Sequence, residues 1–286
     1  WTREELEFIV RSYDGYIASS AEIDSFVRPT NWDTLRQKLR DHYAVIITGA
    51  SGTGKTTASL VLLDELRAEV PGLAVVPITQ GPQQVRAYKQ VGPVVFSIED
   101  PWGRYRFEPQ SEPWNDELDK LLSTATGNRW FVITSRSDVL AESHAKRLSK
   151  KLVVTLESEN YGPRERLKLF RNRVPHLTRR FQDVAERYAS VALNRLRSPL
   201  EIQKYFDNLA EGPADDENEA QYIERSIAAA HRDSIETTIV QQVSNRRAWV
   251  WAAVVWGLLK ARPKQSRALL PQIQAGYGAI EQALED

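Results

Sequence analysis

The sequence predicts an α/β fold, a parallel β-sheet covered by helices, followed by an all-helical part. Three observations predict it. Short apolar runs alternate with helical stretches from about residue 41 to residue 157, which is typical of a parallel sheet with crossover helices. Strand-like runs stop after about residue 161. A glycine-rich segment separates the first predicted strand from the helix that follows it.

Five apolar runs, most of them rich in β-branched residues, are predicted as strands. They cover residues 43–48, 73–78, 94–98, 130–134 and 152–156. The helix after the first strand is expected over residues 56–70, where Leu60, Leu63 and Leu66 recur at helical spacing. Further helices are expected over residues 116–123, 137–148, 164–171, 178–196 and 200–209, with two or three more beyond residue 219. The polar segment 212–217 between them is expected to be a solvated loop.

Composition is typical of a globular protein, and we expect a cytoplasmic protein without membrane contact. The chain has 286 residues, enough for one large domain and a smaller one, and its formal net charge is +0. The absence of cysteine excludes disulfides and thiolate metal sites. The longest apolar run, residues 248–259, is too short to span a bilayer and fits a buried helix. Its Trp249, Trp251 and Trp256 are expected to pack a core or an inter-domain contact. The absence of methionine leaves open that the sequence is a segment of a longer protein, or that residues are missing from it.

The glycine-rich segment fits the pattern G-x-x-x-x-G-K-[ST] of the phosphate-binding loop, or P-loop, of NTPases. Glycines let backbone N–H groups turn toward phosphate oxygens, and the helix that follows adds its positive end. Lys55 is expected to reach the β- and γ-phosphates, and the Thr56 hydroxyl to hold Mg²⁺. A chance glycine turn is the alternative, and the flanking strand and helix count against it. The predicted nucleotide-binding residues are Gly49, Ser51, Gly52, Thr53, Gly54, Lys55, Thr56 and Thr57.

Two carboxylates, Glu99 and Asp100, follow the 94–98 strand. An acidic pair at a strand end about forty residues after a P-loop is typical of a Walker B motif, where one carboxylate binds Mg²⁺ and the other activates the attacking water. We expect Glu99 to act mainly on the metal and Asp100 mainly on the water. The predicted metal ligands are therefore Thr56, Glu99 and Asp100.

Arg136 follows the 130–134 strand, which we expect to lie between the two Walker strands. The tip of such a strand points at the γ-phosphate, and a guanidinium fork suits phosphate oxygens. Arg136 is therefore predicted to sense the γ-phosphate and joins Lys55, Glu99 and Asp100 as a catalytic residue. The alternative is a surface arginine that caps the following helix.

Together these residues resemble the STAND class of P-loop ATPases, the signal-transduction ATPases with numerous domains. Within that class the chain is similar to the third "novel STAND" type of bacterial conflict and anti-phage systems. The likeness covers about residues 25–209. It is carried by the segments Gly49–Thr57, Glu99–Gly103, Ile133–Arg136, Tyr161–Arg166 and Ser198–Leu200.

The resemblance implies an ATP-driven switch with slow hydrolysis that self-assembles when activated. It implies that Pro199 packs on the adenine and that Arg28 and Pro29 line the adenine pocket. Two positions depart from the family pattern: Glu99 stands where an aspartate is usual, and Ser198 replaces a glycine. The resemblance also implies sensor or effector domains, in the same protein or in a partner.

Pattern and resemblance together divide the chain into four segments. We expect an N-terminal helical segment over residues 1–24 and the nucleotide-binding α/β domain over 25–159. A helical lid is expected over 160–212, and a helical region that begins a winged helix near 235–259 over 213–286.

A phosphotransferase or a nucleic-acid-associated motor remains the alternative to a switch. The segment 134–138 does not match a guanine reader, so ATP is favoured over GTP as the ligand. A basic cluster, formed by Arg171, Arg173, Arg179 and Arg180 with His176, leaves nucleic-acid contact open as an alternative to a solvated helix face. The four histidines show no metal-ligand spacing, so no zinc is expected.

Overall fold

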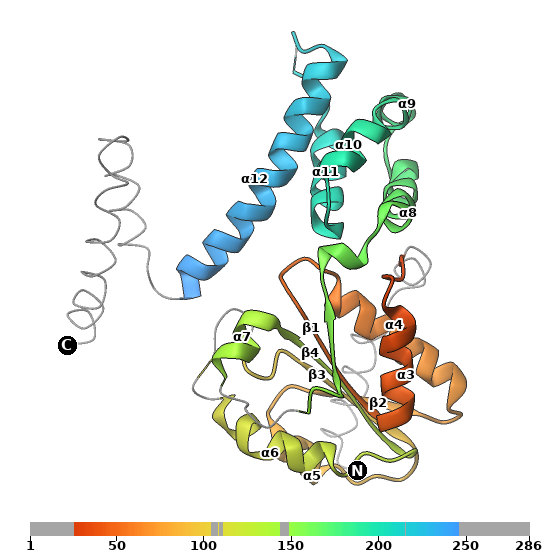
Figure 1. Ribbon diagram of the computed structural model, residues 1–286, viewed down its shortest axis with the longest axis vertical. Coiled ribbons are helices and arrows are strands. Elements are labelled where there is room, and N and C mark those ends of the chain that lie inside the picture. Colours follow the sequence, from red (N-terminus) through yellow and green to blue (C-terminus); the bar gives the residue numbers. More distant parts are fainter. Residues whose placement is uncertain (1–25, 104–107, 109–110, 144–148, 215, 246–286) are drawn as a thin grey trace, which may run out of the picture. The chain divides into compact units, whose positions relative to one another are not determined.

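The structure is a computed structural model that describes residues 26–103, 108, 111–143, 149–214 and 216–245 (Figure 1). Contacts along the chain divide it into two units, residues 1–235 and 236–286. The sheet, the P-loop and most of the helical part lie in the first unit, which is described below.

The first unit contains a parallel sheet of five strands in the order β2-β3-β4-β1-β5. The strands are β1 (Ala44–Gly49), β2 (Ala74–Ile78), β3 (Val94–Glu99), β4 (Arg129–Arg136) and β5 (Val153–Leu156). All five predicted strands are present, within about two residues of the expected bounds. β4 lies between β1 and β3, as expected for an extra strand between the two Walker strands. This parallel α/β fold is that of a P-loop NTPase.

Helices cover both faces of the sheet (Figure 1). α3 (Trp32–His42) and α4 (Lys55–Glu69) pack on one face, where they share a core with Val45 and Ile47 of β1. α5 (Pro82–Ala87), α6 (Glu112–Leu122) and α7 (Ser137–Glu142) lie on the other, with Ala44 and Ile46. Successive side chains of a strand point to opposite faces, so one apolar strand such as β1 supplies both cores. The central strands β1, β3 and β4 are buried on both faces, which accounts for their apolar sequences.

The helical part follows the short 3₁₀ turn Ser158–Asn160 and has its own core. It comprises α8 (Pro163–Arg173), the 3₁₀ turn Val174–His176, α9 (Arg179–Arg187), α10 (Ala189–Arg195), α11 (Pro199–Glu211) and α12 (Glu219–Asn245). Phe170, Tyr205 and Phe206 pack together in this core. α11 begins with a capping box: the Ser198 hydroxyl accepts from the Glu201 amide at 3.1 Å, and the Glu201 carboxylate accepts from the Ser198 amide at 2.9 Å.

Two helix predictions differ from the structure. The helix expected over residues 178–196 is two helices, α9 and α10, separated at Tyr188. α7 ends at Glu142, well before residue 148, and residues 144–148 lie outside the described part. No glycine or proline marks the break at Tyr188. Because α10 packs on both α8 and α9, we attribute the break to packing rather than to local propensity.

Several expectations fall outside the described residues. These are the N-terminal segment 1–24 and the tryptophans Trp249, Trp251 and Trp256. The start of a winged helix near 235–259 is not confirmed: α12 continues to Asn245, and residues 246–286 are not described. Within the part of the chain that the structure describes, no helix combines the length and apolar character needed to cross a bilayer.

Gly49 ends β1 at a point where no side chain fits. Its φ is +155°, and a methyl group there would lie 2.2 Å from the carbonyl oxygen of Leu156 on β5 and 2.8 Å from the Thr53 hydroxyl. Backbone on a neighbouring strand cannot move aside cheaply. We therefore expect Gly49→Ala to destabilise the chain by about 2 kcal/mol or more, the upper part of the range for overpacking and backbone strain.

Thermal unfolding measures this effect, with Gly92→Ala as the matched control. A methyl group at Gly92 meets no atom within 4 Å. The melting temperature should fall by several degrees more in Gly49→Ala than in the control, at roughly 2–4 °C per kcal/mol. Equal melting temperatures in the two variants would contradict the close approach of β1 and β5.

Candidate functional site: the P-loop and the strand ends beside it

The P-loop connects the end of β1 to the start of α4. Gly52 and Gly54 have φ of +77° and +83°, in the left-handed region that favours glycine. The first turn of α4 has no side-chain cap, so its N–H groups are available to an anion, which the helix dipole also attracts. Within the loop, the Lys55 ammonium donates to the Ala50 carbonyl at 2.7 Å, and the Thr53 hydroxyl donates to the same oxygen at 3.0 Å.

A hydrogen bond joins the P-loop to the end of β3. The Thr56 hydroxyl donates to Glu99 Oε1 at 2.9 Å, although the two residues are 43 positions apart. A hydroxyl and a carboxylate oxygen side by side are the hard ligands that Mg²⁺ accepts. The described residues contain no cluster of three or more His, Cys, Asp and Glu that could hold a metal. The pair therefore fits an ion that also takes oxygens from phosphate and water, as Mg²⁺ usually does.

Asp100 directly follows β3 and begins a sharp turn. Its φ is +45°, which is unusual for a residue other than glycine, and its amide donates to the Thr134 carbonyl on β4 at 2.9 Å. The turn closes when the Gly103 amide donates to the Asp100 carbonyl, also at 2.9 Å. Backbone strain of this kind costs about 1–3 kcal/mol and clusters at functional sites. The turn takes Asp100 out of the strand's alternation and leaves it at the sheet edge beside Glu99.

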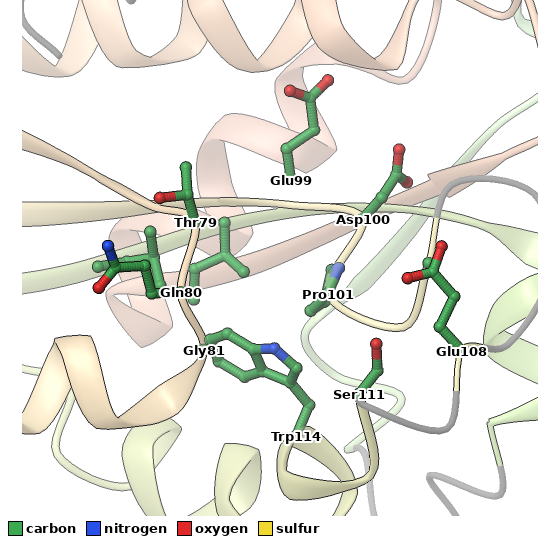
Figure 2. Close-up of a pocket in the computed structure, with 12 residues that line it drawn as sticks. Thr79, Gln80, Gly81, Glu99, Asp100, Pro101, Glu108, Ser111 and Trp114 are labelled. Carbon is green, nitrogen blue, oxygen red and sulfur yellow. The ribbon is translucent and has the colours of Figure 1, made fainter. Parts of the chain in front are cut away.

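A cavity of about 530 Å³ opens at the ends of β2 and β3. Thr79, Gln80 and Ser111 line it together with Glu99 and Asp100. Figure 2 shows the carboxylates of Glu99 and Asp100 at the strand end, on the side away from the Trp114 ring. This cavity reaches Asp100 from the side of β2.

Lys55 lies in the field of the groups on the strand ends. Burial lowers the pKa of its ammonium, and the neighbouring Arg136 lowers that pKa further. The carboxylates of Asp100, Asp138 and Glu99 act in the opposite direction and offset part of that decrease. Two cations and three carboxylates therefore gather at the same edge of the sheet as the P-loop.

Arg136 ends β4 opposite the first P-loop glycine, since it pairs with Gly49 in the register of β1 and β4. Its side chain is only 8% exposed. The guanidinium binds Asp138 with two donors: Nε to Oδ1 at 3.0 Å and Nη2 to Oδ2 at 2.6 Å. The structure places Arg136 beside the P-loop, with a carboxylate bound to its fork. Its role as a γ-phosphate sensor stays a prediction.

The segment after β5 ties the helical part to the P-loop. The Tyr161 hydroxyl donates to the Thr53 carbonyl at 3.1 Å, and burial raises the pKa of this tyrosine to about 12. At the start of α11, the Leu200 side chain packs against Gly52 of the loop. A methyl group added at Gly52 would lie only 2.6 Å from Leu200 Cδ2. Pro199 is the first residue of the same helix. The structure thus brings the predicted adenine-contacting turn to the P-loop.

Arg28 and Pro29, the predicted lining ahead of the P-loop, behave differently. Pro29 is buried. Arg28 is 61% exposed and pairs with Glu65 of α4 at 2.8 Å. Glu65 is ten residues beyond Lys55, or about 15 Å along the helix. The Arg28 guanidinium therefore lies beside the C-terminal half of α4. The role of Arg28 and Pro29 in an adenine pocket stays a prediction.

Three residues that contact the P-loop or Arg136 are not among the site residues predicted from the sequence: Tyr161, Leu200 and Asp138. The contacts of Tyr161 and Leu200 join residues more than one hundred positions apart. Asp138 had a usable signal, because an acid two positions after a basic residue at a strand end is placed to pair with it.

The family described as Novel STAND NTPase 3 matches residues 26–176, more than half of the chain. No curated protein matches the chain. Among solved structures, the chain is similar to PCH-2 from C. elegans (12% identity, TM-score 0.46, 76% of this chain and 75% of that one). It is also similar to the RuvB Holliday junction branch migration motor from Thermotoga maritima (17% identity, TM-score 0.40, 71% and 72%). Saccharomyces cerevisiae RIF2 is a third similar structure (12% identity, TM-score 0.37, 76% and 91%).

Proposed function

This chain belongs to the family of novel STAND NTPases of the third type, and we propose that it is an ATP-binding and ATP-hydrolysing switch. Its nucleotide state would control its conformation and its self-assembly. The observation that carries the proposal is the hydrogen bond between Thr56 and Glu99, which joins the P-loop to the acidic strand end. The resemblance to ATPases of bacterial conflict systems supports a role in anti-phage defence, in the cytoplasm.

In this proposal the P-loop residues from Gly49 to Thr57 hold the phosphates of ATP. Their amides and the uncapped start of α4 face the anion, and Lys55 exchanges its bond to the Ala50 carbonyl for the β- and γ-phosphate oxygens. Thr56 and Glu99 would hold Mg²⁺, which neutralises phosphate charge when bound. Asp100 would orient and deprotonate the attacking water from the adjoining turn.

The helical part would act as the second body of the switch. Tyr161 and Leu200 contact the loop directly, so nucleotide entering the P-loop must be accommodated by the start of α11. A ligand shifts such an equilibrium only by its differential affinity for the two arrangements. ATP and ADP differ at the γ-phosphate. We propose that Arg136, Glu99 and Asp100 distinguish the two nucleotides, because their side chains lie at the strand ends beside the P-loop. ADP would favour a closed monomer and ATP an open form that self-associates.

The domain division goes with this proposal. Residues 25–159 would form the nucleotide-binding domain, 160–212 the lid, and 213–286 a further helical region after the N-terminal segment 1–24. Sensor domains, in the same protein or in a partner, would receive the trigger, and effector domains would respond to it.

A phosphotransferase is the second candidate. The cavity beside Asp100 favours it, because Thr79, Gln80 and Ser111 offer hydrogen-bonding groups to an acceptor that would replace water. ATP hydrolysis without any added acceptor supports the switch. Hydrolysis that requires an acceptor supports the transferase. For a nucleic-acid-bound motor the structure adds little support, since Arg173 of the basic cluster is partly buried and bonded to Gln203.

Removing the guanidinium of Arg136 tests the proposed discrimination. Arg136→Ala should weaken binding of a non-hydrolysable ATP analogue by about tenfold or more, since a hydrogen bond to a charged group contributes about 1.5–3 kcal/mol. ADP affinity should change by no more than about twofold, because ADP has no γ-phosphate. Equilibrium titration with both nucleotides in Mg²⁺ measures the two affinities.

The matched control is Arg179→Ala, which removes an exposed arginine from the start of α9. It should leave both affinities unchanged. In sedimentation velocity, wild type should assemble with the ATP analogue and not with ADP, and Arg136→Ala should assemble less. Equal weakening of ATP and ADP by Arg136→Ala would argue against the sensor role.

A further inference from the structure

The bond between Arg136 and Asp138 is the feature that the proposed function leaves unexplained. Asp138 lies in the first turn of α7, two residues after the end of β4. It holds the Nε–Nη2 edge of the guanidinium, at 3.0 and 2.6 Å. That edge is one of the two on which a planar fork can bind two oxygens of a carboxylate or phosphate at once.

The pair also balances charge beside the P-loop. The side chain of Arg136 is 92% removed from solvent, and Lys55, a second cation, lies close enough for the two to repel each other. A buried cation without a counter-charge is expensive. The Asp138 carboxylate supplies the negative charge that a bound phosphate would otherwise bring.

Asp138 is placed so that it can give up this role. Its side chain is 51% exposed, so water can solvate the carboxylate when Arg136 turns away. Oδ1 also accepts from the Val139 amide at 3.0 Å. That bond to the start of α7 does not involve the arginine. Release of Arg136 therefore does not leave a buried, unpartnered carboxylate.

We propose that Asp138 is an internal stand-in for the γ-phosphate: it occupies the fork of Arg136 until ATP arrives and competes with ATP for it. Asp138 thereby sets how strongly the chain prefers ATP to ADP. The inference rests on the proposed function, because it takes Arg136 as the residue that senses the γ-phosphate. It adds a specificity-determining residue, which acts through Arg136.

The test is Asp138→Asn, which keeps the shape of the side chain and removes its charge. Affinity for a non-hydrolysable ATP analogue in Mg²⁺ should rise by about fivefold or more, the lower end of the range for coupling between two sites. ADP affinity should stay within about twofold of wild type. Asp138→Glu, which retains the charge, should remain closer to wild type. Asp116→Asn, the same change at an exposed position of α6, is the matched control and should alter neither affinity.

A double variant separates competition from a structural effect. In Arg136→Ala, adding Asp138→Asn should leave the ratio of ATP to ADP affinity unchanged. The guanidinium for which Asp138 and the γ-phosphate compete is absent from this variant. Weaker ATP binding in Asp138→Asn would overturn the proposal and make Asp138 an orienting residue. An unchanged ratio in the single variant would overturn it as well.

Two further measurements keep these results interpretable. Thermal unfolding checks that each variant is folded, and Asp138→Ser takes the place of Asp138→Asn if the latter is not. Wild type and Lys55→Ala are titrated alongside. If wild type binds no nucleotide, or binds it as Lys55→Ala does, the proposed function fails. If wild type prefers ATP and neither uncharged Asp138 variant changes that preference, only the stand-in role fails.

Discussion

Replacing Lys55 by alanine is expected to abolish the stabilisation of this chain by ATP and Mg²⁺. In wild type, a ligand at a hundredfold excess over its Kd stabilises the folded state by about 2.7 kcal/mol. At roughly 2–4 °C per kcal/mol, that is a rise of about 5–10 °C in melting temperature. The variant loses the ammonium that now donates to the Ala50 carbonyl and would reach the phosphates. Thermal unfolding with and without ATP and Mg²⁺ measures the difference.

Lys120→Ala serves as the control, since it removes an exposed lysine from α6. It should keep the full shift. Without ligand, Lys55→Ala should melt close to wild type, because burial already disfavours the charged form of this lysine and lowers its pKa. An equal shift in Lys55→Ala and wild type would contradict the assignment of the P-loop.

Asp100→Asn is expected to slow ATP hydrolysis by about a hundredfold or more while leaving ATP affinity nearly intact. General-base catalysis contributes typically 10²–10⁴-fold, and the amide cannot accept the proton of the attacking water. The pocket itself stays filled, because asparagine has nearly the same size. Single-turnover hydrolysis gives the rate, and equilibrium titration gives the affinity.

Glu99→Gln is the informative comparison, because Glu99 accepts from Thr56 and is assigned to the metal. It should weaken Mg²⁺-dependent ATP binding more than Asp100→Asn does. If Asp100→Asn loses nucleotide binding and Glu99→Gln loses only turnover, the two roles are reversed. Asp116→Asn, on the exposed face of α6, should affect neither quantity.

Local signals accounted for most of the fold. The central strands β1, β3 and β4 were predictable because they are buried on both faces and therefore read as apolar runs. The edge strands β2 and β5 are only partly buried, and they were predictable from their β-branched residues. The break between α9 and α10 was not predictable, since it follows from packing on α8 and carries no glycine or proline.

The candidate site was predictable where spacing along the chain carried the chemistry. The P-loop is contiguous, so its glycines, Lys55 and Thr56 could be named from the pattern alone. Glu99, Asp100 and Arg136 could be named because the carboxyl ends of neighbouring parallel strands meet at one edge of a sheet. The adenine-pocket role of Arg28 stays a prediction. Its position ahead of the P-loop could not reveal that its guanidinium pairs with Glu65 on α4.

The sequence by itself therefore determined the fold class, the P-loop and the acidic strand end, because each depends on residues close together in the chain or on the regular order of strands. Only the tertiary structure decided which side chains from distant segments meet. In the structure, Thr56 donates a hydrogen bond to Glu99 and Tyr161 donates one to the Thr53 carbonyl, while Leu200 packs against Gly52. Arg136 also binds Asp138 there. Such contacts depend on the directions of side chains after the sheet has twisted and the helices have packed, and no periodicity in the sequence encodes those directions.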